Sequence, residues 1–257
     1  MSVVQTKGVC IGEGRPKTIV SLMGVTPEEL LIQAKRATFA GPDCVEWRAD
    51  GARALYDADA MADIARTLAK ALPNTPVIAT VRTAGQGGRA ELAPCDYAKL
   101  VRTIVRTEAP DLVDVEACMG DDLVRELVEE AHAHSLHAIV SHHDFQATPP
   151  TDQMRDALAH MAELGADVAK LAVMAHDPAD AARLMQATAE ARHRVEVPLV
   201  TMAMGPAGTV TRLVGESFGS AATFCMLDRP TAPGQVGFAR ASAFLDLLHD
   251  IQEQVAL

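Results

Sequence analysis

The sequence is poor in aromatic residues and in cysteine pairs. Phe, Trp and Tyr together make up 4% of the 257 residues, which favours packed aliphatic layers over an aromatic binding platform. The five cysteines are scattered, odd in number and form no CxxC pair, so we expect a reduced, cytoplasmic protein. We expect two of them, Cys118 and Cys225, to be small core residues.

Positive charge and long apolar runs are also scarce. Lys and Arg number 23 against 34 Asp and Glu, and the net charge of −11 argues against nucleic acid or an anionic membrane as the main partner. No run reaches the roughly 18 apolar residues of a membrane span. The first residues lack the apolar core and cleavage pattern of a signal peptide.

What the chain does contain is a regular alternation of short β-rich runs and Ala-rich amphipathic stretches. We predict strands near residues 18–24, 44–50, 76–83, 112–117, 137–145, 167–174, 198–204 and 221–226. Eight strand–helix units in a chain of this length predict an α/β fold, a (β/α)8 TIM barrel formed as a single domain by residues 1–257. A doubly wound open sheet is the alternative, but the GxGxxG fingerprint after the first strand is missing.

Punctuating residues mark the ends of several predicted elements. Thr26 followed by Pro27, and Asp177 followed by Pro178, are typical of helix starts. Gly165 is placed to end a helix near residues 152–164. The first 17 residues precede the first barrel strand, and VQTKGVCIGEG predicts a short N-terminal hairpin that closes the bottom of the barrel.

Polar side chains occur at alternate positions of six predicted strands. Because side chains alternate across a strand, each set shares one face, which points into a barrel. The sets are Glu46, Arg48 and Asp50; Thr80 and Arg82; Asp114 and Glu116; Ser141 and His143; and Lys170. Buried charges need partners or a function, and the active site of this fold lies at the C-terminal ends of the strands. Internal ion pairs, such as Glu46–Arg48 or Glu116–Arg82, are the structural alternative.

Lys170 lies in ADVAKLAVMAH (166–176), where no other charged residue occurs between Asp167 and His176. An apolar setting disfavours the ammonium form of lysine, and a neutral amine can attack a carbonyl group to form a Schiff base. The alternative is that the side chain lies at a strand end and reaches water.

Arg212 comes from a glycine-containing segment, MGPAGTVTRLVGESFGSAATF (204–224). Gly205 and Gly208 permit a tight loop, after which a short helix could direct its N-terminus at an anion. Arg212 could instead pair with Glu216 on a helix surface. The next segment, LDRPTAPGQVGFA (227–239), is a candidate lid that offers Thr231 and Gln235 as hydrogen-bonding groups.

Together these segments resemble type I 3-dehydroquinate dehydratase over nearly the whole chain. The matching motifs are VSLMG (20–24), EWRAD (46–50), TVRTAGQGG (80–88), SHHDF (141–145), AKLAVM (169–174), residues 204–224 and APGQ (232–235). The resemblance implies a barrel that is usually homodimeric and that uses no metal and no cofactor. It also implies a lyase that converts 3-dehydroquinate to 3-dehydroshikimate in the shikimate pathway of aromatic amino acid biosynthesis.

The resemblance assigns the Schiff base to Lys170 and general acid–base chemistry to His143. It assigns substrate binding to Ser21, Glu46, Arg48, Arg82, Arg212, Thr231 and Gln235, with the substrate carboxylate on Arg212. The chemistry of the two catalytic groups agrees, because an iminium on Lys170 is an electron sink. The imidazole of His143 can take the α-proton and return a proton to the leaving hydroxyl near neutral pH.

Two positions depart from the family pattern. The family usually has a glutamate where this chain has Gln86, and that glutamate helps to hold the histidine. An amide cannot stabilise an imidazolium, so either Asp114 or Glu116 takes over this support or the pKa of His143 is lower here. Thr231 replaces a serine of the lid, keeps the hydroxyl group and adds a methyl group.

Other readings of the same residues remain open at this stage. A class I aldolase would use similar lysine chemistry, and a non-catalytic descendant could bind an anionic metabolite. A metal-dependent barrel could use Glu46, Asp114 and Glu116. Three histidines, His132, His134 and His137, have a spacing that suggests metal at first sight, but i,i+2 positions do not share a helix face. We therefore expect a solvated helix end there, and a structural role for His142.

Overall fold

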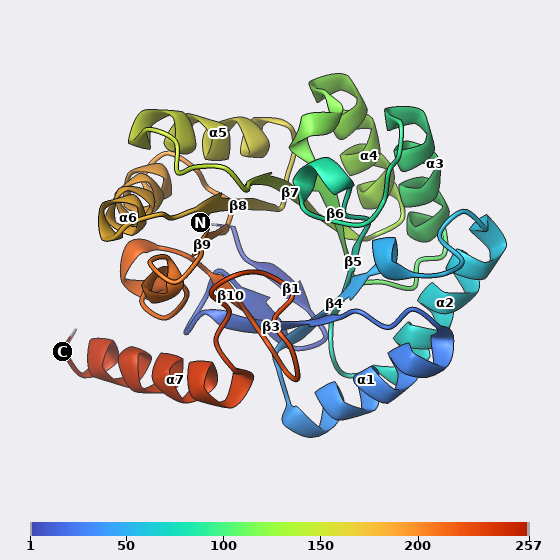
Figure 1. The fold of residues 1–257 in the computed structure, drawn as a ribbon, viewed down its shortest axis with the longest axis horizontal. Helices are drawn as coiled ribbons and strands as arrows, with labels where there is room; N and C mark the ends of the chain where they lie inside the picture. The colour runs from blue at the N-terminus through green and yellow to red at the C-terminus, as the bar shows by residue number, and fades with distance from the viewer. Residues whose placement is uncertain (1, 256–257) are drawn as a thin grey trace.

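The computed structural model describes residues 2–255, and its centre is a barrel of eight parallel strands (Figure 1). The strands are β3 (Lys17–Leu22), β4 (Cys44–Arg48), β5 (Val77–Thr80), β6 (Leu112–Glu116), β7 (His137–Asp144), β8 (Val168–Met174), β9 (Leu199–Met204) and β10 (Ala222–Cys225). They pair in chain order, and β10 returns to pair with β3. Between β9 and β10 the barrel closes through the Ala221 N–H, which donates to the Leu199 carbonyl oxygen at 2.7 Å. The predicted barrel is confirmed.

The barrel is surrounded by seven α-helices in the described part of the chain. They are α1 (Pro27–Ala40), α2 (Ala58–Ala71), α3 (Pro94–Val105), α4 (Asp121–Ala133), α5 (Thr151–Glu163), α6 (Pro178–Arg192) and α7 (Phe238–Val255). The eighth helix expected from the repeating pattern is absent from these residues. Two 3₁₀ turns, Thr209–Arg212 and Gly215–Phe218, connect β9 to β10 instead. Four glycines between residues 205 and 219 oppose a regular α-helix there. No described helix is long and apolar enough to cross a membrane.

The helix-start signals act as expected. The side chain of Thr26 accepts a hydrogen bond from the Glu29 N–H, and that of Asp177 accepts one from the Asp180 N–H. Helix α5 starts at Thr151, and Gly165 follows its end with a φ of +95°. These caps place the start of each helix just after the loop that leaves the C-terminal end of a strand.

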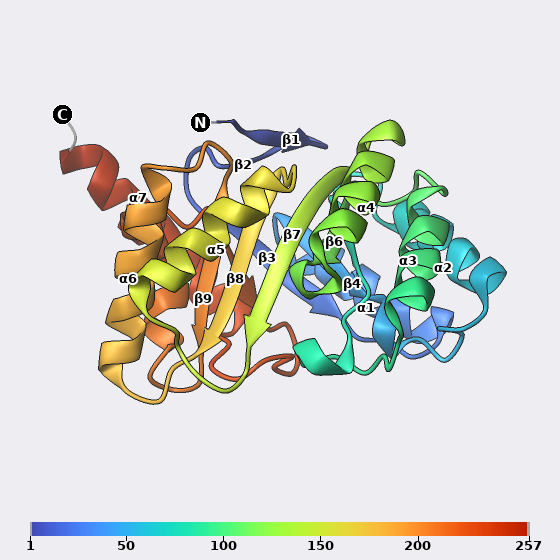
Figure 2. The same cartoon turned by 90° about the horizontal axis from the view of Figure 1, so that it is seen from above.

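A small hairpin closes the opposite end of the barrel, where the strands begin (Figure 2). It consists of β1 (Val4–Thr6) and β2 (Val9–Ile11), which pair antiparallel. Val4 and Ile11 are 3% and 2% exposed, because they pack into the barrel interior. The predicted hairpin is confirmed, and it seals the bottom of the barrel with apolar side chains.

The interior of the barrel changes in character along its axis. Near the hairpin the inward side chains form one apolar cluster, to which the strands contribute Ile19, Cys44, Ile78, Leu112, Ile139, Val168, Val200 and Ala222. Two residues further along, β4 to β8 present polar side chains. The outward residues of the same strands, such as Trp47 and Val113, pack with the helices in a separate apolar cluster. The structure therefore confirms the predicted alternation of inward and outward side chains along these strands.

Candidate active site

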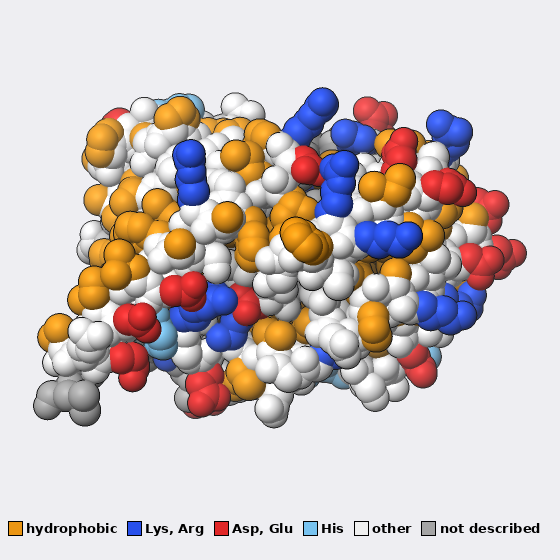
Figure 3. Space-filling model, turned by 90° about the horizontal axis from the view of Figure 1, so that it is seen from below, with side chains coloured by type: hydrophobic (Ala, Val, Ile, Leu, Met, Phe, Trp, Pro, Cys, Tyr) orange, Lys and Arg blue, Asp and Glu red, His pale blue; other side chains and the backbone are white. Residues whose placement is uncertain are grey.

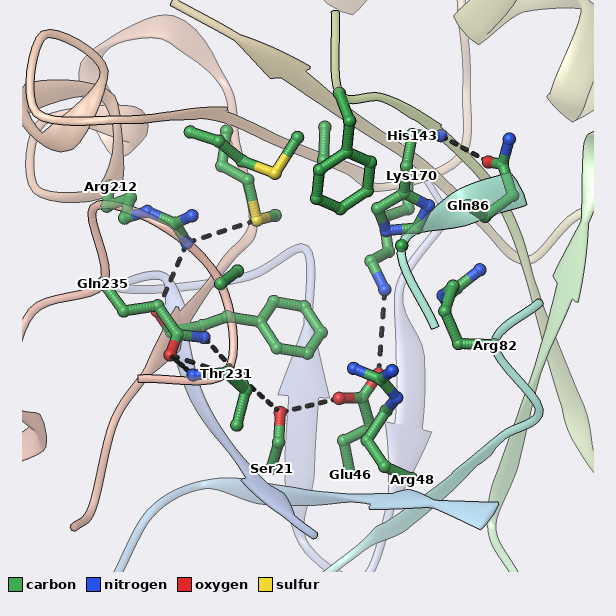
Figure 4. Close-up of a pocket in the computed structure, with 17 residues that line it drawn as sticks. Ser21, Glu46, Arg48, Arg82, Gln86, His143, Lys170, Arg212, Thr231 and Gln235 are labelled. Atoms are coloured by element: carbon green, nitrogen blue, oxygen red, sulfur yellow. Dashed lines mark hydrogen bonds and ion pairs between the residues drawn. The ribbon is translucent and has the colours of Figure 1, made fainter. Parts of the chain in front are cut away.

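A cavity opens at the C-terminal ends of the strands (Figure 4). Ten of the side chains that line it are those singled out in the sequence, namely Ser21, Glu46, Arg48, Arg82, Gln86, His143, Lys170, Arg212, Thr231 and Gln235. They come from separate strands and loops that are far apart in the sequence. The structure thus brings together every predicted catalytic and substrate-binding residue. Asp114 does not line the cavity and lies buried beside Lys170.

Lys170 enters the interior from the middle of β8 and is 4% exposed. Its Nζ lies 2.9 Å from Asp114 Oδ2 and 3.9 Å from Glu46 Oε1. The ring of Phe224 lies 4.5 Å from the amine on another side. The expectation of an apolar setting for Lys170 is wrong, because the apolar neighbours in the sequence face mainly outward while this side chain faces the carboxylates.

Asp114 is a buried carboxylate that contacts Lys170 and two further polar side chains. It accepts a hydrogen bond from the Ser141 hydroxyl at 2.6 Å, and Arg82 Nη2 lies 2.8 Å from its Oδ1. Burial alone would raise the pKa of this carboxyl, but the charges of Arg82 and Lys170 outweigh burial and hold it well below its usual range. Asp114 is therefore a fixed anion next to the amine.

Ion pairs account for part of the polar interior. Arg82 donates to Glu116 at 2.9 Å, as the structural alternative predicted. The predicted Glu46–Arg48 pair does not form, because Arg48 makes two hydrogen bonds with Asp50 at 2.8 and 2.9 Å. Burial alone would lower the pKa of Arg48, but the hydrogen bonds to Asp50 and the negative charge of Glu46 outweigh burial and raise that pKa. Both arginines are fixed in place and still contribute to the cavity wall.

Glu46 is held in a different way from the other carboxylates. The hydroxyl of Ser21 donates to its Oε2 at 2.6 Å, and the hydroxyl of Thr80 donates to its Oε1 at 3.0 Å. These contacts leave the carboxylate directed into the cavity near Lys170. Glu46 thus places a carboxylate oxygen in the cavity wall 3.9 Å from the amine.

His143 lies near the end of β7 and is supported mainly through its backbone. The Oε1 atom of Gln86 accepts a hydrogen bond from the His143 backbone N–H at 2.7 Å. The ring stacks on Phe145, with 6.3 Å between the two centroids. Its Nδ1 atom is buried and has no hydrogen-bond partner within residues 2–255. Gln86 therefore positions the strand rather than the ring.

The electrostatic setting of His143 disfavours its cation. Burial lowers the pKa of this imidazole well below the usual value, and the positive charges of Arg82 and Lys170 lower it further. Asp114 acts in the opposite direction and does not compensate. Of the two outcomes considered for a glutamine at position 86, the lower pKa is the one that agrees with this setting.

Arg212 forms the opposite wall of the cavity and is 3% exposed. Its guanidinium donates only long hydrogen bonds to the carbonyl oxygens of Phe224 and Pro233, at 3.4 and 3.3 Å, besides a contact with a methionine sulfur. Burial lowers its pKa to about 10, and its Nε has no partner in the described chain. The alternative pairing with Glu216 is wrong, because Glu216 pairs with His249. Arg212 is thus a buried cation with no carboxylate partner among residues 2–255.

The lid loop, residues 227–237, contributes Thr231 and Gln235 to the cavity wall, and the last two residues of the predicted lid segment belong to α7. The side chain of Gln235 exchanges hydrogen bonds with the backbone N–H and the hydroxyl of Thr231, at 2.7 and 3.0 Å. Thr231 in turn donates to Ser21 at 3.4 Å. At Gly234, with a φ of +78°, a Cβ would lie 2.5 Å from the Gly205 carbonyl oxygen. Only glycine permits this approach, so the lid is held against the loop after β9.

Several lining residues escaped the interpretation of the sequence. Phe145, Met202, Met204 and Phe224 give the cavity its apolar side. The signal was present in the alternation of the strands, because Phe145 follows His143 by two positions and Phe224 follows an inward alanine by two positions. A polar side chain at an inward position is conspicuous in the sequence, whereas these apolar side chains have the same pattern as core residues.

The remaining cysteine and histidine predictions have mixed outcomes. Cys225 is buried as predicted, but Cys118 is exposed, because it lies in the turn that follows β6. His132 pairs with Asp167 at 2.8 Å and His134 with Glu108 at 3.0 Å. No group of three or more metal-ligating side chains in residues 2–255 is arranged to hold a metal ion. The alternative of a metal site made of Glu46, Asp114 and Glu116 gains no support.

The chain is similar in sequence to known proteins. Residues 18–252 match the family model described as type I 3-dehydroquinase. Among curated proteins, 3-dehydroquinate dehydratase of Bacillus subtilis (strain 168) is 37% identical over 250 residues, which cover 97% of this chain and 98% of the relative. The enzyme of the same name from Salmonella paratyphi B is 38% identical and covers 97% and 99% of the two chains.

Solved structures agree with the sequence matches. Type I 3-dehydroquinate dehydratase from Clostridium difficile, determined with covalently modified comenic acid, superposes with a TM-score of 0.94 at 36% identity. The match covers 97% of this chain and 98% of that chain. The enzyme from Geobacillus kaustophilus gives a TM-score of 0.93 at 33% identity and covers 97% of both chains.

Proposed function

The chain belongs to the type I 3-dehydroquinase family, and from this premise we propose that Lys170 and His143 carry out the shikimate-pathway dehydration of 3-dehydroquinate to 3-dehydroshikimate. One observation carries the proposal. Arg212, a buried guanidinium with no carboxylate partner in the part of the chain that the structure describes, lines the same cavity as Lys170 and His143. A carboxylate on the substrate would supply the missing anion, since a buried charge is costly until it is paired.

The chemistry begins at the amine. Lys170 in its neutral form attacks the ketone carbon of the substrate, and loss of water gives a protonated Schiff base. The neutral imidazole of His143 then takes the α-proton, and the electron pair of that C–H bond moves toward the iminium nitrogen to give an enamine. This step needs an unprotonated histidine, which the lowered pKa of His143 supplies.

The second half of the reaction reverses the flow of electrons. The enamine expels the hydroxyl at the neighbouring carbon, and His143 returns its proton to that hydroxyl so that it leaves as water. A water molecule hydrolyses the conjugated iminium, which releases the product and restores the free amine of Lys170. Atoms balance, because one water is lost from the substrate overall and no redox partner is needed.

The other lining residues are proposed to hold the substrate in register with these two groups. The substrate carboxylate pairs with Arg212, while Glu46, Arg48 and Arg82 bind its hydroxyl groups. Ser21, Thr231 and Gln235 close the cavity from the lid side, and they exclude water from the iminium. Gln86 and Asp114 act as positioning residues, the first through the His143 backbone and the second through Lys170.

The test is a reductive trapping experiment. The protein is incubated with 3-dehydroquinate, reduced with borohydride, digested and analysed by mass spectrometry. We expect a mass increase on the peptide that carries Lys170, its loss in Lys170→Ala, and its retention in Lys99→Ala, which removes an exposed lysine of α3. An active enzyme without an adduct on Lys170 would overturn the covalent mechanism, and a wild-type protein that leaves 3-dehydroquinate unchanged would overturn the function.

We also propose that the protein is a cytoplasmic homodimer, as the resemblance and the cysteine pattern predict. An exposed apolar row on the outer face of α7 supports a partner surface for a second copy (Figure 3). It consists of Phe244, Leu247, Ile251 and Val255, spaced by three or four positions so that they share one helix face. Light scattering on the wild type and on Leu247→Glu tests the dimer, and cell fractionation tests the location. A monomeric wild type would contradict the first prediction.

A further inference from the structure

A second cleft lies directly beside the reaction cavity, between α1, the loop after β5 and the lid loop. Its wall contains a single carboxylate, Asp228, and four guanidinium groups. These belong to Arg36, Arg48, Arg89 and Arg229, and we call this feature the arginine cleft. None of the roles proposed above uses Arg36, Arg89 or Arg229.

Two of the four arginines are already neutralised. Arg48 is paired with Asp50, and Arg36 donates to Asp228 at 2.8 Å. Arg89 and Arg229 are exposed, and neither has a carboxylate oxygen within 4.0 Å of its guanidinium among the residues that the structure describes. The arginine cleft therefore carries two uncompensated positive charges.

These charges matter because of the charge of the whole protein. At −11 the molecule repels an anion at long range, and a local group of cations is needed to reverse the sign of the potential at an entrance. The arginine cleft is such a group, and it lies on the lid side of the cavity. Arg89 and Arg229 are both exposed to solvent in this cleft.

The arginine cleft and the reaction cavity are continuous in their walls. Ser21, Arg48, Gly87 and Thr231 line both of them. On the lid side, the hydroxyl of Thr231 in the lid loop donates to Ser21 at 3.4 Å (Figure 4). A hydrogen bond of this length is weak, so movement of the lid loop would join the two spaces.

We propose that the arginine cleft is a loading site for the anionic substrate, where Arg89 and Arg229 hold the substrate carboxylate before the lid loop moves and Arg212 receives it. This role rests on the proposed function, since it takes the same carboxylate as the reaction cavity. It makes Arg89 and Arg229 determinants of capture and leaves the chemical step to the residues inside the cavity.

The experiment compares Arg89→Ala/Arg229→Ala with Lys70→Ala/Lys99→Ala, a control that removes two exposed positive charges lining neither space. Steady-state kinetics with 3-dehydroquinate are measured from low to high ionic strength. The double variant removes two unit charges. If each acts on the anionic substrate through water over about 9 Å, Coulomb's law predicts a roughly five-fold fall in kcat/KM at low salt, with kcat retained. The difference should disappear near 1 M salt, where the screening length is about 3 Å. Replacement of both arginines by lysine should restore kcat/KM.

Each other outcome counts against the loading site. An equal fall in the control would show an effect of net charge alone, and an unchanged kcat/KM would show that the cleft takes no part in capture. A parallel fall in kcat would place the two arginines in the chemical step or in lid movement. A wild type that does not turn over 3-dehydroquinate would instead overturn the proposed function, and the loading role with it.

Discussion

The two ends of the barrel interior are built from the same strands and have opposite chemistry. At the end closed by the hairpin, Ile78 and Leu112 are fully buried in an apolar cluster. Two residues further along the same strands, Thr80 and Asp114 are equally buried but polar. The transition takes one repeat of the side-chain alternation in each strand.

The closed end of the barrel interior contributes stability, and the open end holds the charged groups of the active site. Apolar burial at the closed end stabilises the fold, at about 25 cal/mol per Å² of buried surface. At the open end, buried charges are costly and are tolerated through pairs such as Arg82–Glu116 and Lys170–Asp114. Substitutions at the two ends should therefore affect different measurements.

The largest expected effect is at the open end. His143→Ala should lower kcat by about 10² to 10⁴-fold, because the general acid–base group is lost. It should leave the free energy of unfolding within about 1 kcal/mol, since Nδ1 of the removed ring has no hydrogen-bond partner among residues 2–255. Kinetics and urea unfolding check both parts. The neighbouring His142→Ala is the control, and a kcat of His143→Ala within ten-fold of wild type would place the acid–base group elsewhere.

A substitution at the closed end should do the reverse. Ile78→Ala should lower the free energy of unfolding by about 2–5 kcal/mol, because it leaves a cavity in the apolar cluster. The kcat of the folded protein should stay unchanged, as measured well below the unfolding temperature. Ile139→Val, which removes one methylene, should cost only about 0.5–1.5 kcal/mol. A several-fold fall in kcat for Ile78→Ala would mean that the two ends are mechanically coupled.

The smallest expected effect is on the pKa of His143. Because its pKa is lowered, the neutral form needed for proton abstraction persists below the usual histidine range, and the acid limb of kcat/KM lies at low pH. Gln86→Glu would add a negative charge beside His143, raise its pKa and move that limb to higher pH. Gln86→Asn adds no charge and should leave the limb in place. Coincident pH profiles for Gln86→Glu and wild type would refute this account.

The comparison also explains which features could be predicted from the sequence. Strand alternation was sufficient to direct Glu46, Arg48, Arg82, His143 and Lys170 to one cavity, because an inward position depends only on the register of its own strand. The helix caps at Thr26 and Asp177 could also be predicted, because each depends only on residues within the next helical turn. Such features need no knowledge of how the strands are arranged around the barrel.

Features that depend on neighbouring strands could not be predicted in this way. The pairing of Lys170 with Asp114, rather than an apolar setting, depends on how β6 and β8 are arranged around the barrel. The choice of Asp50 over Glu46 as the partner of Arg48 depends on a turn after β4. The exposure of Cys118 depends on where β6 ends. In each case the outcome depends on the three-dimensional arrangement around the residue and cannot be read from the alternation of one strand.

The hairpin at the start of the chain has a consequence for molecular traffic. With Val4 and Ile11 buried in the far end of the barrel, the reaction space is a chamber whose floor is sealed within the described chain. Substrate must arrive, and the expelled water and the product must depart, on the side covered by the lid loop. Substrate entry and product release therefore use the same opening on the lid side, and kcat can be no faster than product release through it.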